Sequence, residues 1–129
     1  DESYNSNPLS LESAIKNFNS INIKSSKKHF VMGDMLELGK HTKKLHIQIS
    51  KIINLSSIGS VSVFGKAVKE TYKKIKTNKR GIVLKEKSKI FDLIVNDLNN
   101  NDYLMIKGSN STGLNKFVKI LKRKKSNVI

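Results

Sequence analysis

Short runs of apolar residues alternate along the chain with longer segments of mixed polarity. Four of these runs lie at residues 31–32, 61–64, 82–84 and 103–106. Short apolar runs of this kind are typical of buried strands. The pattern therefore predicts four short, buried β-strands.

The intervening segments carry apolar residues at the three- and four-residue spacing of one helix face. Five such segments are present, and their apolar positions are Leu11, Ala14, Ile15 and Phe18; Leu45, Ile49, Ile52 and Ile53; Val68, Tyr72 and Ile75; Phe91, Ile94 and Leu98; and Leu114, Phe117, Val118 and Leu121. Asn7 before Pro8 suits the start of the first helix, and Ser88 is the expected N-cap of the fourth.

Strands and helices alternate with short connections, and the chain shows no internal repeat or long linker. Such alternation favours right-handed βαβ units. We therefore predict an α/β fold of one domain, residues 1–129: a Rossmann-like, mostly parallel sheet with helices on both faces. Because the chain begins at Asp1 without a methionine, we expect it to be part of a longer protein.

The amino-acid composition excludes several kinds of site and segment. The chain has no cysteine, which excludes disulfides, thiolate metal sites and cysteine nucleophiles. No stretch approaches the roughly 20 apolar residues that span a bilayer, and nothing resembles a signal peptide. We expect a cytoplasmic protein with no membrane insertion. We expect a monomer.

The formal net charge of +15 raises the possibility of nucleic-acid binding. However, the basic residues are almost all lysine, and Arg80 and Arg123 are the only arginines. Specific recognition of bases and phosphates relies on the bidentate arginine fork. We therefore interpret the lysines as a solvated surface that also attracts anionic substrates, and we do not expect nucleic acid as a partner.

Polar, glycine-containing turns follow three of the predicted strands: Gly33-Asp34, Gly65-Lys66 and Lys107-Gly108-Ser109. In open parallel sheets, ligands bind beyond the carboxyl ends of the strands. The three turns therefore predict a site at one edge of the sheet. The opening segment, residues 1–8, would lie at the same edge if a strand precedes it.

The opening segment, Asp-Glu-Ser-Tyr-Asn-Ser-Asn-Pro, contains two carboxylates, a phenol and two amides just before a helix. Such groups suit a ribose, a peptide or a phosphate, but an ordinary Asn-Pro helix start explains them equally well. The loop from Gly33 to Gly39 also has one functional and one purely structural interpretation. Asp34 and Glu37 would position a cation or a metal-bound water, or the loop simply reverses the chain.

The three histidines give no metal site. His41 and His46 are five residues apart and so lie on different sides of a helix. We expect His41 near the helix start, His46 on the helix surface and His29 at the start of a strand.

Residues 107–113 follow the last strand and open the last helix. A lysine beside free helix N–H groups suits a carboxylate or phosphate, although the G-x-x-x-x-G-K-[ST] pattern of a Walker loop is absent. The alternative is a polar turn in which Ser111 or Thr112 caps the helix.

Together, these segments resemble the C-terminal domain of the Mur ligases. The opening segment matches their D-[DE]-S-Y-N-[AS]-N-P signature, and residues 33–39 match G-D-M-x-E-L-G, followed by a histidine at position 41. Val63-Phe64-Gly65 and Lys107-Gly108-Ser109 occur in the expected order. The resemblance is greatest to members that add D-alanyl-D-alanine to UDP-N-acetylmuramoyl-tripeptide, because other members carry histidine or lysine variants in the opening motif.

The resemblance implies a reaction that uses ATP and Mg²⁺, bound mainly by a central domain. By analogy, Asp1 or Glu2 would hold the ATP ribose. Tyr4, Asn5 and Asn7 would line the interdomain cleft, and Lys107, Gly108 and Ser109 would help hold the dipeptide. No catalytic residue is expected in this domain. Asn110 stands where many relatives have arginine, which puts that contact in doubt.

Two alternatives remain. One is a freestanding Rossmann-like module for a nucleotide or nucleic acid, although no G-x-G-x-x-G follows a strand. The other is a sister Mur ligase that adds a different amino acid.

Overall fold

A four-stranded parallel sheet forms the centre of the molecule. The computed structural model describes residues 8–35, 39–99, 101–109, 112–122 and 128. The sheet has the order β3-β2-β1-β4, and all its strand pairs are parallel. Its strands are β1 (Lys28–Gly33), β2 (Ser60–Phe64), β3 (Arg80–Leu84) and β4 (Tyr103–Lys107). The predicted fold class is confirmed.

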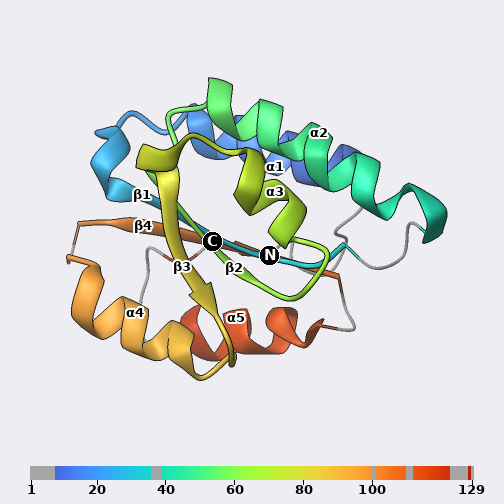
Figure 1. The fold of residues 1–129 in the computed structure, drawn as a ribbon. Helices are drawn as coiled ribbons and strands as arrows, with labels where there is room; N and C mark the ends of the chain where they lie inside the picture. Colours follow the sequence, from blue (N-terminus) through green and yellow to red (C-terminus); the bar gives the residue numbers. More distant parts are fainter. Residues whose placement is uncertain (1–7, 36–38, 100, 110–111, 123–127, 129) are drawn as a thin grey trace.

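Helices cover both faces of this sheet (Figure 1). The helices α1 (Pro8–Asn19), α2 (Thr42–Leu55) and α3 (Lys69–Lys74) lie on one face. The helices α4 (Lys89–Asp97) and α5 (Leu114–Lys122) lie on the other. Short 3-10 turns at Ser25–Lys27, Gly39–His41 and Thr77–Lys79 occupy parts of the connections. No helix in the described ranges is long and apolar enough to cross a bilayer.

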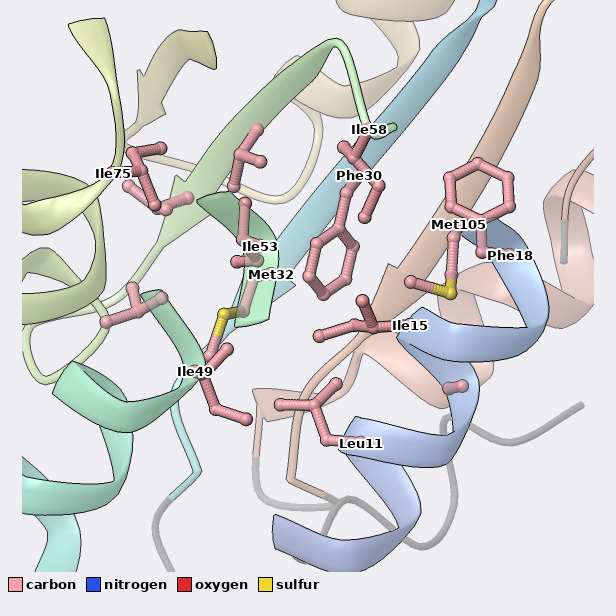
Figure 2. Close-up of a cluster of buried hydrophobic side chains, with 14 of the residues drawn as sticks. Leu11, Ile15, Phe18, Phe30, Met32, Ile49, Ile53, Ile58, Ile75 and Met105 are labelled. Carbon is pink, nitrogen blue, oxygen red and sulfur yellow. The ribbon is translucent and has the colours of Figure 1, made fainter. Parts of the chain in front are cut away.

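The strand β1 separates two hydrophobic cores. Side chains alternate across a strand, so Phe30 and Met32 pack in the core under α1 and α2, whereas Val31 packs in the core under α4 and α5. Figure 2 shows the first core, in which Leu11, Ile15 and Phe18 of α1 and Ile49 and Ile53 of α2 surround the strand residues. Burial on both faces explains why β1 reads as a continuous apolar run.

The third predicted strand is less buried than expected. Leu84 is buried, but Ile82 and Val83 are 45% and 40% exposed. The reason is position: β3 lies at the end of the strand order, next to β2 alone in the described sheet. An apolar run indicates a strand, but it does not distinguish a central strand from an edge strand.

Ser88 occupies the N-cap position of α4, as predicted, but its side chain makes no capping hydrogen bond. Its hydroxyl instead donates to Oε2 of Glu86 at 3.2 Å. The first helix begins at Pro8, as predicted.

Not every lysine is solvated as expected. Lys28 is 1% exposed, and its Nζ donates to the carbonyl of Asn19 and to Oγ of Ser57, both at 2.8 Å. This ammonium therefore connects the end of α1 to the loop before β2. Burial lowers the pKa of Lys28 below its ordinary value because desolvation disfavours the charged form. Lys79 is held similarly by the carbonyls of Ser56 and Ile58.

We expect the buried Lys28 to make stability rise with pH. Between its lowered folded pKa and its ordinary unfolded pKa, the unfolded chain binds more protons, so the free energy of unfolding increases across that window. Lys28→Met removes this group, and its stability should rise less over the same range. Urea unfolding of both proteins between neutral and alkaline pH measures the difference, and parallel pH profiles would contradict the expectation.

Candidate functional site

The three turns predicted to form a site meet at the carboxyl edge of the sheet, and Asp34 connects them. Asp34 follows β1 and is 8% exposed. Its Oδ1 accepts from the amide of Val68 at 2.8 Å, and its Oδ2 accepts from the amide of Lys66 at 3.1 Å. Its carbonyl accepts from the amide of Ser109 at 2.9 Å. One residue thus ties the turn after β1 to the turns after β2 and β4.

These contacts require a glycine at position 65. Gly65 has a φ of +128°, in the region that L side chains rarely adopt. A Cβ at this position would lie 2.4–2.5 Å from the carboxylate atoms of Asp34. The backbone after β2 can therefore approach the carboxylate only without a side chain.

A second close approach joins the turns after β1 and β4. A Cβ on Gly108 would lie 3.2 Å from Cα of Gly33 and 2.8 Å from Cδ1 of Leu114. The start of α5 therefore packs directly over both glycines. This arrangement fixes the spacing between two parts of the predicted site.

The turn after β4 is closed by Thr112. Its amide and its Oγ1 both donate to the carbonyl of Ser109, at 2.9 and 2.6 Å. Its Oγ1 also accepts from the amide of Leu114 at 3.3 Å, which is the helix-capping role expected of Thr112. The side chains of Lys107 and Ser109 are buried, at 4% and 1% exposure. Ser109 and Thr112, the described residues on either side of this turn, are thus held together by two hydrogen bonds.

His46 is the residue that the sequence interpretation placed wrongly. It was expected on the helix surface, yet it is fully buried. Its Nδ1 donates to the carbonyl of Thr42 at 2.7 Å, and its Nε2 accepts from the amide of Met35 at 3.2 Å. The second bond holds the residue next to Asp34. The signal was present in the sequence, because His46 shares a helix face with Ile49 and Ile53.

The structure describes only some of the remaining residues that were predicted for the site. His41 is exposed and lies just before α2, as expected. Other predicted positions lie outside the described residues: Asp1, Glu2, Tyr4, Asn5, Asn7, Glu37, Asn110 and Ser111. Within the described part of the chain, no three His, Asp or Glu side chains are grouped so that they could hold a metal ion.

His29 is the second residue of β1 and so lies near the start of a strand, as predicted, but at the amino end of the strands and not at the carboxyl end. Its Nε2 lies 2.9 Å from Oδ2 of Asp102, which also accepts from the amide of Asn99 at 3.1 Å. Lys28 and Tyr103 are paired at this same amino end of β1 and β4. The contact between His29 and Asp102 therefore stabilises the amino end of the strands, at the opposite end of the sheet from the three turns.

Comparison with known proteins agrees with this arrangement. Residues 2–110 match the model of the family described as Mur ligase, glutamate ligase domain. The chain is 26% identical over 125 residues to the UDP-N-acetylmuramoyl-tripeptide–D-alanyl-D-alanine ligase of Treponema pallidum (strain Nichols), covering 95% of this chain and 27% of that protein.

A solved structure shares the fold. The MurF ligase of Thermotoga maritima, determined in complex with ADP, superposes with a TM-score of 0.75 at 22% identity. The match covers 95% of this chain and 27% of that one. The chain thus spans about a quarter of the length of each relative.

Removal of the Asp34 carboxylate should destabilise the fold by about 2–4 kcal/mol, because two largely buried amides lose their acceptor. We expect Asp34→Ala to lower the urea midpoint accordingly. Asp92→Ala is the matched control: its carboxylate is 63% exposed and contacts only Lys89 among the ion pairs found, so it should change stability by less than about 0.5 kcal/mol. Equal effects of the two substitutions would contradict a connecting role for Asp34.

Proposed function

The chain belongs to the Mur ligase family, and from that membership we propose that it is the C-terminal domain of an ATP-dependent ligase. The ligase would join D-alanyl-D-alanine to UDP-N-acetylmuramoyl-tripeptide during synthesis of peptidoglycan precursors, in the cytoplasm. The observation that carries the proposal is the match of 95% of this chain to a ligase named for that reaction. Because the chain spans 27% of that protein, the activity is assigned to the complete protein.

The geometry of the carboxyl edge supports a substrate-positioning role. The turns after β1 and β4 are held together by the contact of Gly33 with Gly108 and by the bond from Ser109 to Asp34. A prearranged edge of this kind lowers the cost of orienting a ligand. We assign the dipeptide to the neighbourhood of Lys107, Gly108 and Ser109.

The opening segment would complete this edge. It directly precedes α1, so it leads into the same domain that carries the three turns. Its carboxylates, Asp1 or Glu2, would accept hydrogen bonds from the ATP ribose. Tyr4, Asn5 and Asn7 would face the nucleotide and the dipeptide across the cleft to the rest of the protein.

The chemistry needs positioning and charge stabilisation rather than a protein nucleophile. The γ-phosphoryl group of ATP passes to the terminal carboxylate of the tripeptide, which releases ADP. The dipeptide amine then attacks the acyl phosphate, and inorganic phosphate leaves as the amide forms. This chain would close over the nucleotide and present the amine.

ATP phosphates and Mg²⁺ are assigned to another part of the protein. The sequence holds no G-x-x-x-x-G-K-[ST] pattern, and the described residues contain no cluster of metal ligands. The isolated chain should therefore show no ATP turnover.

The substrate assignment is tested with the intact protein. We expect ADP release that requires both UDP-N-acetylmuramoyl-tripeptide and D-alanyl-D-alanine, with a new UDP-linked pentapeptide seen by mass spectrometry. Replacing the dipeptide by single amino acids and the tripeptide by shorter UDP-linked acceptors is the control. Turnover with a single amino acid and none with the dipeptide would identify a sister Mur ligase instead.

The opening motif is tested by Asn5→Ala and Asn7→Ala in the intact protein. Loss of an orienting amide should reduce kcat/KM about 100-fold without unfolding the protein. Asn17→Ala, at an exposed position of α1, is the matched control and should leave the rate unchanged. Normal kinetics in the Asn5 and Asn7 variants would refute their placement at the site.

A further inference from the structure

A row of lysines occupies the outer face of α2 and the turn before it. Lys40, Lys43, Lys44 and Lys51 are all exposed, and with Ile47 and Gln48 they line one shallow depression. Their spacing of three, four and seven residues places them along one helix face. We call these six residues, together with Leu55, the α2 basic face.

The fold holds this face outward. The opposite side of α2 is buried through His46, Ile49, Ser50 and Ile53. His46 is bonded to the loop after β1, and its carbonyl accepts from Oγ1 of Thr71 in α3. Helix α2 forms part of the outer layer (Figure 1). The helix therefore cannot rotate its lysines toward the core.

The positive charge of the face is not balanced within the part of the chain that is described. The ion pairs found there involve Lys16, His29, Lys73 and Lys89, and none involves a lysine of the α2 basic face. None of the six residues that line the depression is acidic. The face therefore complements an anionic partner.

Leu55 adds an apolar group to the same face. It is the last residue of α2 and is 89% exposed. It lies four residues after Lys51 and eight after Ile47, so it continues the row. Lysines are attracted to anionic headgroups, and the exposed Leu55 beside them adds apolar area that the boundary of the acyl chains would bury.

We propose that the α2 basic face docks on an anionic phospholipid surface. Nucleic acid fits the face less well, because the row contains no arginine fork and no aromatic side chain on which a base could stack. Lysines act as point charges, which suits a diffuse layer of phosphate headgroups, and Leu55 enters the boundary of the acyl chains. This contact is independent of the ligase chemistry proposed above.

The test is sedimentation of the intact protein with vesicles of phosphatidylcholine, alone or mixed with phosphatidylglycerol. We expect binding to the mixed vesicles only, weakening as salt screens the charges. Substituting all four lysines of the face by glutamine should weaken binding by about 600-fold, since each lysine near an anionic surface contributes about five-fold.

The matched control substitutes Lys85, Lys89, Lys116 and Lys119 by glutamine. These lysines are exposed in and around α4 and α5, on the other face of the sheet, so the total charge falls equally. This variant should bind within about three-fold of the parent, because its charges lie on the face of the sheet that points away from the membrane. Equal losses in the two variants, binding to neutral vesicles, or binding to duplex RNA without binding to vesicles would each overturn the proposal.

Leu55→Ser tests whether an apolar contact contributes to membrane binding in addition to electrostatic attraction. We expect this variant to lose about three-fold or more in vesicle affinity, most clearly at high salt where the electrostatic part is screened. Circular dichroism confirms that each variant is folded. Parental affinity of Leu55→Ser at high salt would overturn apolar docking by this face.

Discussion

The structure depends on a single carboxylate at the centre of the sheet's carboxyl edge. Asp34 accepts two backbone amides from the segment after β2, and its carbonyl accepts one from the turn after β4. A buried carboxylate is costly unless its oxygens are hydrogen-bonded, so these amides and Asp34 stabilise one another. The glycine at position 65 is a consequence of this contact, because a side chain there would collide with the carboxylate.

The ligase function proposed above would use this edge to orient a substrate. Hydrogen bonds within the chain hold the turns of the edge together. Buried His46 extends this support, since its ring holds the amide of Met35 directly after Asp34. At the other end of the strands, Lys28 and the pair of His29 and Asp102 brace the sheet. The sheet is thus braced by side-chain contacts at both ends of its strands.

The distribution of charge follows from the same packing. Burial of one side of α2 leaves its lysines on the other, where no acidic residue is among the described residues that line their depression. The net charge of +15 therefore does not describe an even surface. Some lysines, such as Lys28 and Lys79, are structural, whereas those of the α2 basic face are available to an anionic partner.

The sequence by itself determined the fold class, the order of elements and the edge at which the turns meet. Alternating apolar runs and helical periods report local geometry, and glycine-rich motifs such as residues 33–39 and 107–109 are recognisable without coordinates. Tertiary structure alone decided the hydrogen-bond partners of Asp34, His46 and Lys28. Their partners at Val68, Met35 and Asn19 are 34, 11 and 9 residues away, and no local pattern predicts which distant backbone groups a side chain meets. It also decided that β3 is an edge strand, because strand order depends on how the whole sheet packs.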